Sequence, residues 1–170
     1  IHVNCKIEER DPMRPWLPHP GTEIGGSGVV IAPGRILTNA HVVHQAKEIL
    51  LETDQTPLPV NGTILAIDLG RDLALIEGTD EDFIAMHPPV ELMEGLPSDG
   101  ADIIVMGYPM GGETLSTTTG VISRCEWEKS GRSMDEGMRV QVDAAVNPGN
   151  SGGPGFVDGT IAGISVSGPA

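Results

Sequence analysis

The sequence has few aromatic and few basic residues. Phenylalanine, tryptophan and tyrosine make up only 3% of the 170 residues, so the chain offers no row of rings on which nucleic-acid bases could stack. Ten lysines and arginines stand against 24 acidic residues, and the net charge of −14 has the wrong sign for binding a phosphate backbone. No apolar run approaches the roughly 20 residues that a membrane-spanning helix needs. We therefore expect neither a nucleic-acid partner nor a membrane span in this chain.

Cysteine is also scarce, with only Cys5 and Cys125. A chain of this length buries about 70% of the surface that its unfolded form exposes, so it needs no disulfide framework. The two cysteines can close one very long loop or remain reduced, and we favour free thiols. The histidines and cysteines lack metal-ligand spacing such as C-x-x-C or H-E-x-x-H, so we expect no metal and no organic cofactor.

Glycine (23 residues) and proline (14 residues) are abundant, and 39% of the chain is hydrophobic. This composition favours many short strands joined by tight turns. Segment 25–39 predicts two strands around a type II turn at 32–35, and 40–46 predicts one helical turn. About ten short strands indicate an all-β barrel or sandwich. The other expected strands are 48–53, 58–67, 72–77, 101–107, 115–125 and 138–143, followed by a hairpin with strands at 156–157 and 160–161 around an Asp-Gly turn.

The most unusual string is Asn147-Pro148-Gly149-Asn150-Ser151-Gly152-Gly153. Its glycines allow positive φ and close approach of a substrate, so Ser151 can be an exposed nucleophile flanked by open backbone N–H groups. The alternative is a glycine-rich turn that the serine merely caps. Gly149 to Gly153 also fits the G-x-S-x-G elbow of α/β-hydrolases, whose catalytic histidine follows the serine. Here all five histidines precede Ser151, which excludes the elbow and leaves the order His, Asp, Ser.

A base and an acid for Ser151 can be sought earlier in the chain. His41 and His44 both follow the second strand of the first hairpin, and we favour His41 because it lies at the junction of strand and turn. Asp72 opens an apolar strand, with Asp68 as its competitor four residues earlier. An acid in this place holds the imidazole tautomer and stabilises the imidazolium when the serine gives up its proton.

Five blocks of the sequence stand out: GSGVVIAPGRILTNAHVV (26–43), RDLALIE (71–77), YPMGG (108–112), TTGVISR (118–124) and QVDAAVNPGNSGGP (141–154). Taken together, these blocks resemble the HtrA/Deg family of serine proteases over about residues 26–166. The resemblance implies the chymotrypsin-like serine protease fold, all-β with two six-stranded-type antiparallel β-barrels. It implies His41 as general base, Asp72 as orienting acid and Ser151 as nucleophile. It also implies an oxyanion hole from the N–H groups of Gly149 and Ser151, with Asn150 between them.

The resemblance also implies details of the site and its surroundings. Gly149 is the expected pivot of a loop whose N–H can turn toward the oxyanion or away from it. The pocket for the residue before the cut is expected to include Val146, Ser165, Val166 and Ser167, with a preference for valine or alanine. Residues 1–22, which carry four prolines, are expected to form an extended arm, and residues 23–170 the protease domain. The final barrel strand, the closing helix and a PDZ domain are not expected within the chain.

The function expected from the resemblance is endoproteolysis of unfolded or damaged proteins in protein quality control. The expected partners are extended polypeptide substrates and further copies of the chain in a trimer or a multiple of it, with Trp16 as a candidate anchor. An extracytoplasmic compartment, such as the bacterial periplasm, or an organelle is favoured. One alternative is a chaperone-like module whose oxyanion hole rests in an inactive form. Another is an esterase for small acyl substrates, which would want a closed apolar pocket.

Overall fold

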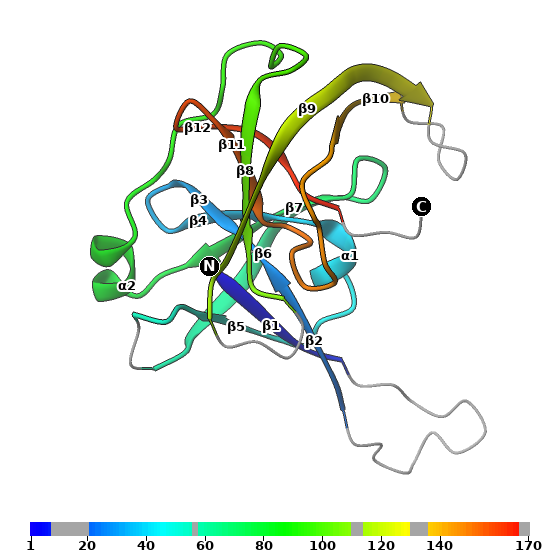
Figure 1. Cartoon of the computed structure of the whole chain (residues 1–170). Coiled ribbons are helices and arrows are strands. Elements are labelled where there is room, and N and C mark those ends of the chain that lie inside the picture. Colours follow the sequence, from blue (N-terminus) through cyan, green and yellow to red (C-terminus); the bar gives the residue numbers. More distant parts are fainter. Residues whose placement is uncertain (8–20, 56–57, 110–113, 130–135, 167–170) are drawn as a thin grey trace, which may run out of the picture.

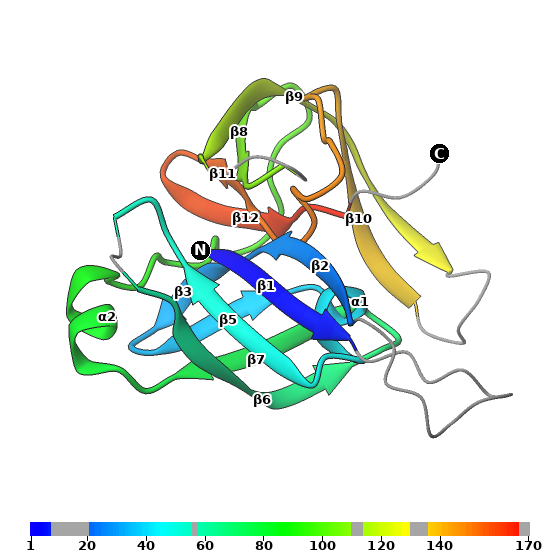
Figure 2. The ribbon, with the colours of Figure 1, turned by 90° about the horizontal axis from the view of Figure 1, so that it is seen from below.

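The computed structural model describes residues 1–7, 21–55, 58–109, 114–129 and 136–166. These residues form twelve strands and two short helices (Figure 1). The strands make two antiparallel sheets, one from the first half of the chain and one from the second, and Figure 2 shows the second sheet lying above the first. No helix among the described residues is long and apolar enough to cross a membrane.

The first sheet has seven strands in the order β2-β1-β5-β6-β7-β4-β3. Its two edge strands, β2 and β3, are consecutive parts of one extended run that is interrupted only at Gly28, so the sheet closes on itself as a ring of six strand positions. The strands are β1 (His2–Ile7), β2 (Thr22–Ser27), β3 (Val29–Ala32), β4 (Arg35–Thr38), β5 (Glu48–Glu52), β6 (Val60–Asp68) and β7 (Leu73–Gly78).

The second sheet has five strands in the order β10-β9-β8-β11-β12. Within the described residues its edge strands β10 and β12 do not pair with each other, so the sheet is curled but open. The expected second barrel of six strands is therefore one strand short in this part of the chain. The strands are β8 (Asp102–Gly107), β9 (Ser116–Lys129), β10 (Glu136–Val142), β11 (Pro154–Val157) and β12 (Thr160–Ile164).

Two turns adopt the geometry that their sequences predict. Between β3 and β4, Gly34 has φ +67°, as the third position of a type II turn requires. Between β11 and β12, Asp158 and Gly159 both have positive φ, +50° and +79°, as a type I′ turn requires. Both predicted hairpins are thus confirmed.

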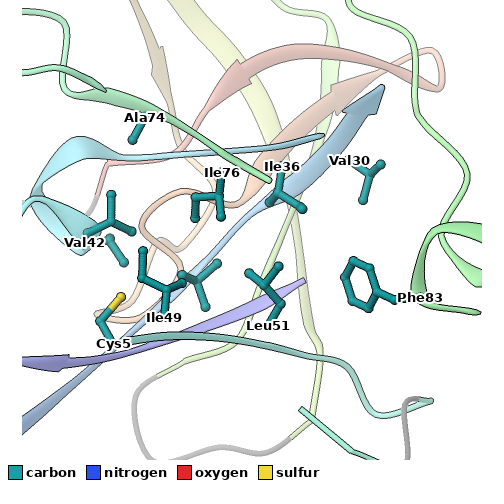
Figure 3. Close-up of a cluster of buried hydrophobic side chains, with 11 residues drawn as sticks. Cys5, Val30, Ile36, Val42, Ile49, Leu51, Ala74, Ile76 and Phe83 are labelled. Carbon is teal, nitrogen blue, oxygen red and sulfur yellow. The ribbon is translucent and has the colours of Figure 1, made fainter. Parts of the chain in front are cut away.

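Each sheet encloses its own apolar core. Side chains alternate between buried and half-buried along β7, so every second residue points into the first barrel. The first core is the larger one, and its buried side chains come from five strands and both helices. Figure 3 shows these side chains converging. Its buried members are Val3, Cys5, Val30, Ile36, Val42, Val43, Ile49, Leu51, Ala74, Ile76 and Phe83. The second core consists of Ile103, Val105, Ile122, Ala144 and Val157.

The first residues of the chain, which fall within the expected extended arm, form a strand. Residues His2–Ile7 form β1, which pairs with both β2 and β5 and contributes Val3 and Cys5 to the first core. This stretch is therefore part of the first barrel, because its alternating apolar side chains help to fill the core. The rest of the proline-rich segment, including Trp16, lies outside the described residues.

A second helix was not expected from the sequence. Helix α2 (Glu81–Met86) begins after Asp80, whose side chain accepts a hydrogen bond of 2.7 Å from the backbone N–H of Phe83. The helix places Phe83 in the first core. The other helix, α1 (Ala40–Val43), lies within the expected helical turn.

Candidate active site

The pairing of two strands brings His41 and Asp72 together. Strands β4 and β7 run antiparallel with Thr38 opposite Ala74, so the end of β4 lies beside the beginning of β7. His41 follows β4 in helix α1, and Asp72 directly precedes β7. The two residues are 31 positions apart in sequence, yet the register of this strand pair makes them neighbours.

Asp72 holds His41 through two hydrogen bonds. Nδ1 of His41 lies 2.7 Å from Oδ2 of Asp72, and the backbone N–H of His41 donates to Oδ1 over 2.8 Å. The backbone of Asp72 has φ +56°, a left-handed conformation that is uncommon outside glycine. Its carbonyl accepts a bond of 2.9 Å from Nδ2 of Asn39. The imidazole is therefore fixed with Nε2 on the side away from the carboxylate.

The pKa of Asp72 is lowered from its ordinary value. Burial acts to raise it, but the hydrogen bonds from the His41 side chain and backbone, together with the charges of His41 and Arg139, outweigh burial. Asp72 is thus an ionised carboxylate at neutral pH. Such a group stabilises a positive charge on His41 when the ring takes up a proton.

The two competitors have other contacts. The carboxylate of Asp68 accepts the backbone N–H of Arg71 at 3.0 Å and the guanidinium of Arg71 at 2.9 Å. His44 is exposed and lies at the end of helix α1, where its backbone N–H donates to the carbonyl of Ala40. The structure therefore brings His41 and Asp72 together and leaves Asp68 with Arg71.

Ser151 lies on the loop before β11, and this loop is attached to the first barrel. The backbone N–H of Ser27 donates to the carbonyl of Ser151 over 2.7 Å. Gly26 lies between Ser151 and helix α1. A Cβ on Gly26 would lie 2.6 Å from Cγ1 of Val42, the residue after His41 in this helix, and 3.3 Å from the carbonyl oxygen of Ser151. The backbone of Ser151 is therefore close to the helix that carries His41. Ser151 is only 4% exposed, whereas the sequence suggested an exposed serine.

The segment before Ser151 forms a tight turn. The backbone N–H of Asn150 donates to the carbonyl of Asn147 over 3.0 Å, Pro148 occupies the second position, and Gly149 has φ +97°. This pattern is that of a type II turn, which needs glycine at its third position. A type I and a type II turn differ by a flip of the central peptide, here Pro148–Gly149, so the backbone at Gly149 determines which way its N–H points.

A cavity of about 380 Å³ borders this loop, between β10 and β12. Val146, Ser165 and Val166 all line it, while Ser167 lies outside the described residues. Ser165 also binds the loop, because its hydroxyl donates to the carbonyl of Asn150 over 2.5 Å. The remaining walls are mostly apolar and include Ile103, Val105, Val140, Val142 and Ala162.

Two residues near the histidine and aspartate were not anticipated. Asn39 is buried, and its side chain is hydrogen-bonded to the backbone of Asp72. The sequence signal that could have identified Asn39 is its position two residues before His41. Arg139 comes from β10 in the other sheet, and its charge acts on Asp72 across the interface. No sequence signal links it to Asp72, because the two residues are neighbours only in the folded chain. Among the described residues, no group of three or more His, Cys, Asp or Glu could hold a metal ion.

Known proteins share this architecture. Residues 26–164 match the family described as a trypsin-like peptidase domain. Protease Do-like 4, mitochondrial, from Arabidopsis thaliana is 39% identical over 153 residues, which cover 90% of this chain and 29% of that protein. The serine protease DegP homolog from Plasmodium falciparum is 35% identical over 168 residues, covering 96% and 19%. The HtrA-type protease AlgW with decapeptide superposes with a TM-score of 0.76 at 26% identity, covering 98% of this chain and 54% of AlgW.

The fold defines a two-sheet, chymotrypsin-like β protein, as the sequence predicted. The chain belongs to the trypsin-like peptidase family, and these relatives and this structural neighbour are Do-like, DegP and HtrA-type proteases. It spans less than a third of the length of both curated relatives.

Proposed function

We propose that the chain is a serine endopeptidase that uses His41, Asp72 and Ser151. The observation that carries this proposal is the pair of hydrogen bonds by which Asp72 fixes His41, at 2.7 and 2.8 Å. The attachment of the Ser151 carbonyl to Ser27 supports it, because this bond joins the loop of the second sheet to the barrel that carries the histidine.

The reaction follows from the roles of these groups. Nε2 of His41 accepts the hydroxyl proton as Ser151 Oγ attacks the carbonyl carbon of the scissile peptide. The carbonyl oxygen becomes an oxyanion, which we assign to the N–H groups of Gly149 and Ser151. His41 then gives its proton to the leaving amine, and an acyl-enzyme remains on Ser151. A water molecule, deprotonated by His41, hydrolyses the ester and restores the serine.

The substrate preference is proposed from the walls of the 380 Å³ cavity. Val146, Ser165 and Val166 line it, and its other walls are largely aliphatic. We assign this cavity to the side chain that precedes the cut, and the expected preference is for valine, alanine or a similar small aliphatic residue. An extended polypeptide fits an open cleft better than a compact protein does, so unfolded chains are the proposed substrates.

The wider role belongs to the same proposal. Curated relatives with up to 39% identity are Do-like and DegP proteases, and this supports a place in protein quality control. Assembly into a homo-oligomer is proposed on the same resemblance.

The test is cleavage of casein, which is loosely folded, by the chain and by its Ser151→Ala variant. Cleavage by the chain that disappears in the variant is the expected result. A peptide series that varies only the residue before the cut is expected to show the highest kcat/KM for valine or alanine. If neither protein cuts casein but both bind it, the chaperone-like alternative replaces the protease.

A further inference from the structure

Ser27 makes four hydrogen bonds, and three of them connect the two halves of the molecule. It ends strand β2 of the first barrel and is 1% exposed. Its backbone N–H donates to the Ser151 carbonyl over 2.7 Å, and its carbonyl accepts the Thr38 hydroxyl over 2.6 Å. Its own hydroxyl donates to the Gly149 carbonyl over 2.8 Å and accepts the backbone N–H of Tyr108 over 2.8 Å.

Two of these bonds hold the backbone on either side of Asn150. The Gly149 carbonyl belongs to the peptide unit that follows the Gly149 N–H, and the Ser151 carbonyl to the unit that follows the Ser151 N–H. Ser27 therefore anchors the peptide next to each of the two proposed oxyanion donors. Since Ser27 belongs to the barrel that carries His41 and Asp72, it also fixes both donors relative to the base.

Two glycines let the chain approach Ser27 closely. A Cβ on Gly107 would lie 2.9 Å from Oγ of Ser27, and a Cβ on Gly152 would lie 2.1 Å from its carbonyl oxygen. Both glycines are needed for this close approach. The bond from Oγ therefore restrains the Gly149–Asn150 peptide, and a flip of the turn is confined to the preceding peptide, between Pro148 and Gly149.

We propose that Ser27 is a positioning residue for the oxyanion hole, acting through the carbonyl of Gly149. The inference rests on the proposed function, because it assumes that Gly149 and Ser151 stabilise an oxyanion. Ser27 itself does not touch the reacting atoms. Loss of its hydroxyl leaves two buried backbone groups without a partner, the Gly149 carbonyl and the Tyr108 N–H. The turn then relaxes, and the donors lose their alignment in the transition state.

The main test compares the wild-type chain with Ser27→Ala on a peptide substrate. We expect kcat to fall about 10-fold while KM stays within about 2-fold, since a small misplacement of catalytic donors is costly and ground-state binding does not use them. A peptide boronate, which forms a tetrahedral adduct, is expected to bind about 10-fold more weakly. A product peptide, which needs no oxyanion hole, is expected to bind equally well to both proteins.

The matched control is Thr38→Val. It removes the other buried hydroxyl that bonds to Ser27, but it leaves the bonds to Gly149 and Ser151 in place. Its kcat is expected to stay within about 2-fold of wild type even where its melting temperature falls. Should Ser27→Ala not fold, Ser27→Cys takes its place, because a thiol fills the site and is only a weak donor. A several-fold loss of kcat at unchanged KM is then expected.

The outcomes separate this inference from the proposed function. A wild-type chain that cleaves peptides, together with a Ser27→Ala or Ser27→Cys variant of unchanged kcat, overturns the role of Ser27 alone. Equal losses of kcat in Thr38→Val and Ser27→Ala also overturn it, because a general loss of packing then explains both. A wild-type chain that neither cleaves peptides nor reacts with a fluorophosphonate at Ser151 overturns the proposed function and this inference with it.

Discussion

Asp72 accepts two hydrogen bonds from one residue, the ring and the backbone N–H of His41. Replacing Asp72 by asparagine keeps the shape but puts an amide where the carboxylate was, so the tautomer with Nε2 free to take a proton is no longer favoured. We expect kcat to fall by about 10⁴-fold with a smaller change in KM. The measurement is steady-state cleavage of a fluorogenic peptide.

Asp68→Asn is the control for this substitution. Asp68 lies four residues before Asp72. Its replacement breaks the exposed ion pair with Arg71 and leaves the bonds between Asp72 and His41 in place. Exposed pairs of this kind contribute little to stability, so activity and stability should stay near wild type. A large loss of kcat in Asp68→Asn and none in Asp72→Asn would reverse the assignment.

The same carboxylate predicts a pH dependence of stability. Hydrogen bonds hold the pKa of Asp72 below its ordinary value in spite of burial. A group whose folded pKa is lowered stabilises the fold above its unfolded pKa, and this contribution is lost as the pH falls through the folded pKa. The difference in melting temperature between wild type and Asp72→Asn should therefore be present at neutral pH and shrink below about pH 4. A difference that does not change on acidification contradicts the lowered pKa.

Gly149 has φ +97°, a conformation that a residue with a Cβ rarely adopts. Alanine at this position should push the turn toward a conformation in which its N–H no longer faces the oxyanion. We expect Gly149→Ala to lower kcat by about 10² or more and to change KM much less. Steady-state kinetics measure both. Gly95→Ala is the control, because Gly95 has a similar φ of +82° with open space around it. Equal kinetics for Gly149→Ala and wild type would exclude Gly149 as the pivot.

The sequence predicted the elements that have clear local signals. The turn glycines and the alternating apolar residues predicted both tight hairpins and most strands. The motif around His41 and the residues before β7 pointed to the pair that the structure joins. Such features are fixed by short-range chemistry, so they can be identified before the fold is known.

Other features depend on tertiary contacts and had no such signal. Helix α2 has six residues, too few to show a helical period, and only its cap Asp80 marks its beginning. Strand β1 precedes a proline-rich stretch, so its place in the barrel appears only through its pairing with β2 and β5. The choice between Asp68 and Asp72 was open because it depends on the left-handed backbone at Asp72.

The first core predicts the cost of one truncation. Leu51 is completely buried in β5 of the first barrel. Leu51→Ala should lower the free energy of unfolding by about 2–5 kcal/mol, because the closed barrel cannot collapse into the space left behind. Leu65→Ala on the neighbouring strand β6 is the control, since Leu65 is 44% exposed and should change stability by about 0.5 kcal/mol or less. Denaturant unfolding measures both, and equal losses would contradict the assignment of the core.

The two cysteines are free thiols in different environments, as the sequence favoured. Burial in the first barrel raises the pKa of Cys5 to about 12. Burial and the charge of Asp99 also raise the pKa of Cys125, but this residue is only half-buried, and its Sγ lies 3.5 Å from the carbonyl of Pro97. Because the thiolate is the reactive form, iodoacetamide at pH 8 should modify Cys125 in the native protein and Cys5 only after unfolding. Mass spectrometry of tryptic peptides distinguishes the two sites. Cys125→Ser should remove the native-state labelling, and in denaturant without reductant two thiols should react in the wild type. If neither the native-state labelling of Cys125 nor the reaction of two thiols in denaturant is seen, the cysteines pair. Rapid labelling of Cys5 in the native protein would mean that β1 leaves the barrel readily.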